Sequence, residues 1–385
     1  MLNQILNIII LAFVSMSFIY IGIIRHKNTK YFYLSPDRNA LLDIFKAFAI
    51  FNIIFIHTVW WSGQKYIPYE EIGQISLFVD VPLFFFLSGW ATIYQENNLF
   101  TFLKRIIQIY IPYVLYGFIL ITIYILYHKK VFTYRDIIDY LFFDFGPIFN
   151  WSTLVGALWF IRLYFLILII TPFLKVIAKH NILSLILIAI TVSVNIFYTI
   201  KNEPPLQFQI PGIWDPQQLS FYIFFYFLGI YTQNIYLTKK ELFIIIIINT
   251  LIILFCSSIN ADVFNLQKNK FPPNIFYLLS SLYSVVLVLF VKKYEIFIKN
   301  KIRENRLFKF ISLCGEKVYS IFFCQHIGGA LIYHIVYKFN YLNWFSLIII
   351  SYILNLIISI TTGFLFDSVN KFYIRNIKRA LIGIK

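Results

Sequence analysis

The stretch ALLDIFKAFAIFNIIFIHTVWW, residues 40–61, decides the fold. It is apolar along nearly its whole length, and it is long enough to cross the hydrocarbon core of a bilayer, which takes about 20 residues of α-helix. Similar apolar runs follow one another along the chain with short polar breaks between them. A soluble protein would need a charged surface that this sequence lacks, so we predict an integral membrane protein.

The composition of the 385 residues supports the same interpretation. Hydrophobic residues make up 60% and charged residues 13%, against roughly 45–50% and 25% in soluble domains. The net charge of +16 could indicate a nucleic-acid partner. However, Lys and Arg gather in alternating loops and not on one soluble face, so we expect membrane lipid and no nucleic acid as a partner.

The apolar runs predict an all-α fold, a polytopic integral membrane helix bundle of about 10–11 transmembrane helices. The first run is too long for a signal-peptide core and has no basic start or cleavage site, so residues 1–30 are predicted to be an extra N-terminal transmembrane anchor. Residues 31–385 then form a single membrane domain. The predicted spans lie near 2–24, 40–61, 75–94, 106–127, 157–175, 182–200, 219–236, 242–259, 275–292, 317–337 and 345–366.

The loops between these spans predict an orientation. One alternate set is rich in Lys and Arg, including the residues around 25–38, 104–105, 292–306 and the C-terminal tail, whereas the opposite set holds most of the acidic residues and prolines. Basic loops face the cytoplasm. We therefore predict a multi-pass protein of the plasma (cytoplasmic) membrane with its N-terminus outside and its C-terminus in the cytoplasm.

Three ionisable residues, Asp43, Lys46 and His57, lie inside the apolar stretch 40–61. Such residues are costly within a membrane, which makes function the first hypothesis. At about 100° per residue their side chains fall within about 60° of one another, so they form one polar stripe. A buried ion pair with a histidine at a helix contact is the structural alternative.

Asp80 opens the third predicted span, at about the depth of His57. A carboxylate there could orient the imidazole as a base-orienting partner does in general base catalysis, or it could be a solvated interfacial residue. Ser88 and Gly89, later in the same span, are small residues that let helices approach closely. A nucleophilic role for Ser88 is the weaker interpretation.

Two motifs stand out in this part of the chain: Leu-Asp-Ile-Phe-Lys-Ala-Phe-Ala-Ile, with ten residues between Lys46 and His57, and then Val-Pro-Leu-Phe-Phe-Phe-Leu-Ser-Gly. They resemble the membrane acyltransferase-3 family, and within it the polysaccharide O-acyltransferases. The resemblance covers about residues 40–330. The further matches, in order, are Lys104-Arg105, Pro112-Tyr113, Leu158-Trp159-Phe160, Phe224-Phe225, Leu228-Gly229, Ser320 and Gln325-His326.

The resemblance implies transfer of an acyl group, most simply acetyl, from cytoplasmic acyl-CoA to a hydroxyl of a cell-surface or lipid-linked glycan, with His57 as the essential histidine. A neutral imidazole is suited to take the proton of a sugar hydroxyl. The family normally has arginine where this chain has Lys46, and an arginine where it has Gln108. The charge survives at Lys46, but the bidentate geometry of arginine does not.

Four further residues complete the predicted site. Lys104 and Arg105 lie at the cytoplasmic mouth, where they could bind the CoA phosphates together with Lys46 or act as topology anchors. Arg162, inside the fifth span, could bind acceptor phosphate or form an ion pair with Asp80. His326, near the middle of the tenth span, is a substrate-binding candidate or a helix-packing residue.

Acyl-CoA and a glycan are thus the expected substrates, with no permanently bound cofactor and no metal. The three cysteines have no metal-ligand spacing. Two alternative functions remain open. A polysaccharide exporter or lipid-linked sugar flippase would share the polar stripe, although the chain shows no matching halves. A catalytically silent partner in a polysaccharide-synthesis complex would tolerate loss of His57.

Overall fold

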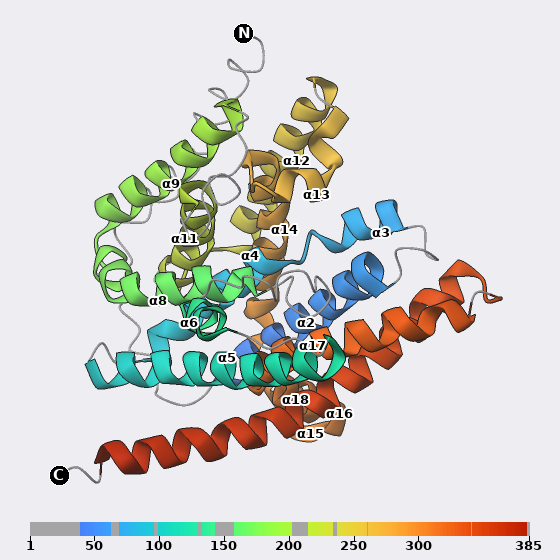
Figure 1. Ribbon diagram of the computed structural model, residues 1–385. Coiled ribbons are helices and arrows are strands. Elements are labelled where there is room, and N and C mark those ends of the chain that lie inside the picture. The colour runs from blue at the N-terminus through green and yellow to red at the C-terminus, as the bar shows by residue number, and fades with distance from the viewer. Residues whose placement is uncertain are drawn as a thin grey trace. The chain divides into compact units, whose positions relative to one another are not determined.

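The computed structural model describes residues 39–62, 69–95, 99–128, 133–142, 158–201, 215–233, 237–259, 261–339 and 341–382. Within these ranges the regular structure is helical and contains no strand, as Figure 1 shows. The predicted all-α fold is therefore confirmed. The predicted anchor at residues 1–30 lies outside the described ranges, and the single domain at 31–385 stays a prediction.

Nine helices among the described residues are long and apolar enough to cross a membrane, and they coincide with nine of the predicted spans. Of the other two predictions, the run 2–24 is not described, and the run 219–236 coincides with α11 (Pro216–Tyr231), a helix of 16 residues. The nine are Ala40–Trp60, Glu70–Tyr94, Thr101–Ile123, Trp159–Ile177, Asn181–Thr199, Lys239–Ser258, Ile275–Glu304, Val318–Phe339 and Trp344–Asn376.

The helices group into two compact units, which we describe separately. Unit 1 takes in the described parts of Met1–Phe45, Gln74–Glu96 and Ile169–Glu304. It contains the end of α8 (Trp159–Ile177) and all of α4 (Val81–Ala91), η2 (Thr92–Tyr94), α9 (Asn181–Lys201), α11, α12 (Lys239–Ile259), η4 (Ala261–Phe264), α13 (Leu266–Lys270), α14 (Ile275–Val291), η5 (Lys292–Tyr294) and α15 (Glu295–Glu304).

Unit 2 takes in the described parts of Lys46–Gly73, Asn97–Leu168 and Asn305–Lys385. It contains most of α2 (Ala40–His57) and of α3 (Tyr69–Ser76), the start of α8, and all of η1 (Thr58–Ser62), α5 (Leu99–His128), α6 (Tyr134–Leu141), α16 (Arg306–Glu316), α17 (Val318–Ile335), η6 (Val336–Phe339) and α18 (Trp344–Ile382).

Close contact between α4 and α11 organises unit 1. A Cβ added to Gly89 would overlap the backbone carbonyl of Tyr226, and one added to Gly229 would overlap the carbonyl of Phe86. Glycine on each helix therefore lets the two backbones touch, as small residues do at membrane-helix interfaces. Helix α4 itself begins after Asp80, with proline in its first turn, where no backbone N–H is needed.

Packing of α17 against α18 organises unit 2. Gly363 of α18 leaves no room for a Cβ beside the backbone of Ile321 on α17. Further along the same pair, Ile332 and Val336 pack with Leu347 and Ile348 in a buried apolar cluster. This rigid pair carries Gln325 and His326, both fully buried.

Candidate functional site

His57 is the last residue of α2, where the regular helix gives way to the π-helix η1 (Thr58–Ser62). π-Helical turns are rare and occur often at functional sites. The side chain of His57 is buried, with 8% of its surface exposed. The wider π turn therefore begins immediately after the histidine that the sequence predicts to be essential.

The hydroxyl of Thr58 fixes this change of helix type. Its Oγ1 donates to the carbonyl of Ile54 at 2.7 Å and accepts from Nδ2 of Asn355 on α18 at 2.9 Å. The hydroxyl of Ser359 in turn donates to Oδ1 of Asn355 at 3.1 Å. Gly328 on α17 leaves space for that asparagine, because a Cβ there would overlap Oδ1 of Asn355. Buried polar groups satisfied in this way hold the backbone beside His57 in one arrangement.

The imidazole of His57 has a buried partner on α17. Its Nδ1 lies 3.0 Å from Oε1 of Gln325, whose side chain is fully buried. An amide oxygen can only accept, so Nδ1 of His57 must donate. In the neutral ring this leaves the lone pair on Nε2, which is the form that a general base requires.

His326 lies next to this pair. The centroid of its ring is 5.9 Å from that of His57, and its Nδ1 donates to the carbonyl of Phe323 at 3.1 Å. The rings of Tyr116 and Phe322 flank it. The structure therefore brings two of the predicted site residues together, while a substrate-binding role for His326 stays a prediction.

The cationic residues of the predicted site also belong to unit 2. Lys46 lies on α2, eleven residues before His57, and is half-buried. Arg105 on α5 and Arg162 on α8 are half-buried as well, whereas Lys104 is exposed. At 1.5 Å per residue, Lys46 and His57 are separated by about 16 Å along one helix.

Asp80 lies in unit 1, where it has two partners of its own. Its Oδ2 is 2.6 Å from Nζ of Lys270 and accepts from the hydroxyl of Tyr277 at 2.7 Å. Both charged side chains are buried, with 9% of Lys270 and 2% of Asp80 exposed. The predicted pairings of Asp80 with His57 and with Arg162 would each join the two units, and they stay predictions.

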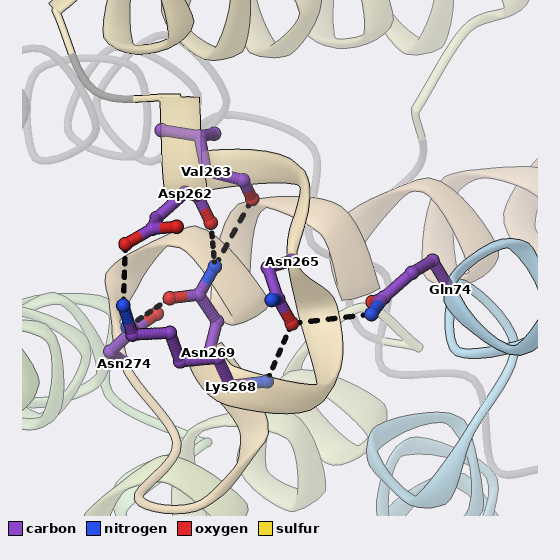
Figure 2. A network of polar contacts seen from close by, with 7 residues as sticks. All are labelled: Gln74, Asp262, Val263, Asn265, Lys268, Asn269 and Asn274. Carbon is purple, nitrogen blue, oxygen red and sulfur yellow. Dashed lines mark hydrogen bonds and ion pairs between the residues drawn. The ribbon is translucent and has the colours of Figure 1, made fainter. Parts of the chain in front are cut away.

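The loop between α12 and α14, which carries Lys270, contains a network of polar contacts among the neighbouring residues. Figure 2 shows this network. The amide of Asn269 donates to the carbonyls of Asp262 and Val263 at 2.9 and 3.1 Å, and Asn274 donates to Oδ1 of Asn269 at 2.6 Å. Gln74 joins the network through Asn265 at 3.2 Å. Asn274 also caps α14, whose first turn carries Tyr277.

Three residues that contact Asp80 or His57 were not predicted from the sequence, namely Lys270, Tyr277 and Gln325. Lys270 and Tyr277 carry no motif, and only the folded loop brings them to Asp80. Gln325 did give a signal, because a glutamine inside an apolar span is costly unless it has a partner. It also directly precedes His326 in one of the motifs quoted above.

In the described part of the chain, no group of His, Cys, Asp and Glu side chains could hold a metal ion. Cys256, Cys314 and Cys324 are buried free thiols. Burial raises the pKa of Cys314, which lies outside the membrane-spanning helices, to about 11, although Lys317 opposes the shift. A thiol with such a pKa is a poor nucleophile at neutral pH.

Comparison with known proteins gives one match. Residues 39–364 match the family model described as an acyltransferase domain. No curated protein and no solved structure matches the chain significantly. The matched range includes both helices that carry His57 and Gln325.

Proposed function

Because the chain belongs to the acyltransferase-3 family of membrane acyltransferases, we propose that it moves an acyl group, most simply acetyl, from acyl-CoA to a hydroxyl of a cell-surface or lipid-linked glycan. The observation that supports this reaction is the contact of His57 with Gln325, which presents Nε2 of the imidazole as a base. The O-acetyl group and the glycan acceptor extend the family assignment.

The proposed reaction needs one proton acceptor. Nε2 of His57 takes the proton of the acceptor hydroxyl while the hydroxyl oxygen forms a bond to the thioester carbon. The carbonyl electron pair moves to the oxygen. When that pair returns, the carbon–sulfur bond breaks, and the CoA thiolate takes the proton from the imidazolium. Direct transfer of this kind requires no nucleophilic side chain.

The expected orientation divides the substrates between the two sides of the plasma membrane. We propose that the basic loops face the cytoplasm, as such loops usually do, so that Lys104 and Arg105 lie on the side where acyl-CoA is made, with the N-terminus outside and the C-terminus inside. The positive charges of Lys104 and Arg105, near the start of α5, are suited to bind the phosphates of CoA. Lys46 lies further along the stripe toward His57, and Arg162 and His326 are proposed to contact the acceptor.

The test is ester formation on the glycan, measured by mass spectrometry. Cells lacking the protein are complemented with wild type, His57→Ala or His180→Ala at matched membrane abundance; His180 is an exposed histidine and serves as the control. We expect wild type and His180→Ala to restore the esters, and His57→Ala to reduce the rate by about 10²–10⁴-fold, as for loss of a general base.

Two results would contradict the proposal. Full acylation by His57→Ala would remove the histidine from the chemistry and leave a silent partner in a synthesis complex. If cells lacking the protein keep the same ester content per glycan but carry a different amount of glycan on their surface, the protein would be an exporter. Purified protein supplied with radiolabelled acetyl-CoA and de-O-acylated glycan separates these cases, because only an acyltransferase releases CoA in proportion to ester.

A further inference from the structure

The side-chain amide of Gln325 contacts His57 through its oxygen only, which leaves its NH2 group outside that contact. Oε1 accepts from Nδ1 of His57, but Nε2 is buried and has no hydrogen-bond partner in the structure as described. A buried donor left unsatisfied costs about 1–3 kcal/mol. In a native structure such a group indicates a ligand, water or a catalytic role that supplies the missing partner.

The orientation of this amide group is restricted. Its oxygen is held by His57, and its backbone lies in α17, a helix fixed to α18 through Gly363 and the cluster of Ile332. The ring of Phe322 lies on the same helix and packs against the ring of the neighbouring His326. A donor held rigidly in apolar surroundings interacts strongly with developing negative charge, because no solvent must reorganise.

We propose that Gln325 is a catalytic residue whose Nε2–H donates to the oxyanion formed in acyl transfer. The inference rests on the proposed function. When the acceptor oxygen bonds to the thioester carbon, the carbonyl electron pair moves to oxygen, and the free N–H of Gln325 binds that oxygen. When the pair returns and the CoA thiolate leaves, the hydrogen bond weakens again. One amide thus serves the base with its oxygen and the oxyanion with its nitrogen.

A role limited to orienting His57 makes a different prediction, and Gln325→Glu separates the two. Glutamate has nearly the same shape and offers a carboxylate oxygen to Nδ1, so it preserves the orientation of the imidazole. Carboxylates do this work beside the histidine of serine hydrolases, which also form an oxyanion. The substitution removes the N–H donor and adds the negative charge of the carboxylate. Gln325→Met removes both contacts at similar volume.

The experiment measures kcat, KM and the pH profile of purified wild type, Gln325→Glu and Gln325→Met with acetyl-CoA and de-O-acylated glycan. The control is Gln233→Glu, a half-buried glutamine of unit 1 that accepts from Lys292. We expect both Gln325 variants to lose about 10²–10³-fold in kcat, with KM for acetyl-CoA within about twofold, and Gln233→Glu to keep the wild-type kcat.

The pH profile shows whether Gln325→Glu still contacts His57. A carboxylate at Nδ1 stabilises the imidazolium, so the lower apparent pKa of kcat/KM should rise in this variant. A raised pKa with a lost kcat supports the oxyanion role. A kcat within about threefold of wild type, or a loss confined to Gln325→Met, would overturn it and leave Gln325 as an orienting residue. Wild-type protein that transfers no acyl group would overturn the proposed function itself.

Discussion

Nδ1 of His57 and Oε1 of Gln325 lie 3.0 Å apart although 268 residues separate them in the sequence. The hydrogen bond joins the end of α2 to the middle of α17 and determines which nitrogen of the imidazole carries the proton. The π-helix that follows His57 is fixed by α18 through Thr58. Three helices of unit 2 therefore determine the position of one ring.

The first prediction concerns Asn355, the residue of α18 that holds Thr58. We expect Asn355→Leu to lower kcat about tenfold, equal to about 1.4 kcal/mol, because the hydroxyl of Thr58, the residue after His57, loses its hydrogen bond from α18. Steady-state kinetics at matched purity measures the effect. Ser368→Ala, which removes an exposed hydroxyl of α18, is the control. A wild-type kcat in Asn355→Leu would show that the π-helix keeps its position without the hydrogen bond from Asn355.

The sequence predicted part of this site for a physical reason. His57 and Lys46 stand out because ionisable residues are costly in an apolar span. The motifs marked His326 as a substrate-binding candidate or a packing residue, and the structure adds that its ring lies beside that of His57. The contact with Gln325 could not be predicted in detail. Periodicity assigns residues to faces of one helix, but it does not say which helices meet.

The second prediction concerns the crossing of α4 and α11. We expect Gly89→Ala and Gly229→Ala each to destabilise the protein by about 1–3 kcal/mol, because each new methyl group would overlap a backbone carbonyl of the facing helix. Lower membrane abundance and a lower apparent Tm in detergent measure this. Ser88→Ala is the control. Normal stability of both glycine variants would show that the two helices can move apart to accommodate the methyl group. Loss of activity in Ser88→Ala would instead support the hypothesis that Ser88 is a nucleophile.

The helices were easier to predict than their contacts. Long apolar runs identify spans because the bilayer requires about 20 such residues, and nine described helices agree. Gly89 of α4 was expected at a close approach of helices, but its partner depends on tertiary structure, and the matching role of Gly229 on α11 was not predicted. Helix α11, of 16 residues, begins earlier than predicted, because Asp215 and Pro216 supply a cap and a first residue that hydropathy ignores.

The third prediction tests the buried pair of Asp80 and Lys270. Lys270→Met leaves a carboxylate buried without its cation, so we expect destabilisation of about 3–5 kcal/mol, seen as a lower apparent Tm. The double variant Asp80→Asn, Lys270→Gln removes both charges and should regain most of the stability.

Activity of that double variant decides the role of Asp80. If Asp80 only fixes the loop of Figure 2, kcat should return together with the stability. If Asp80 orients His57, the stable double variant should remain slow. The exposed pair of Asp262 and Lys268 provides a matched control, since its neutralisation by Asp262→Asn and Lys268→Gln should change neither stability nor kcat.

The last prediction concerns Asp215, the N-cap of α11. Its Oδ1 accepts from the backbone N–H of Gln217 at 2.9 Å. Burial raises the pKa of Asp215 above its ordinary 3.8, although the N–H groups of Gln217 and Gln218 oppose the shift. A carboxyl whose pKa is raised on folding contributes stability below its unfolded pKa, and this contribution is lost as the pH rises through the folded value.

Asn caps a helix as well as Asp does, so Asp215→Asn should raise the apparent Tm at pH 8, with the gain vanishing below about pH 4. Asp215→Ala loses the cap, which costs about 0.5–2 kcal/mol, and should be less stable than Asp215→Asn at every pH. A pH-independent difference between wild type and Asp215→Asn would show that the carboxyl does not titrate on folding.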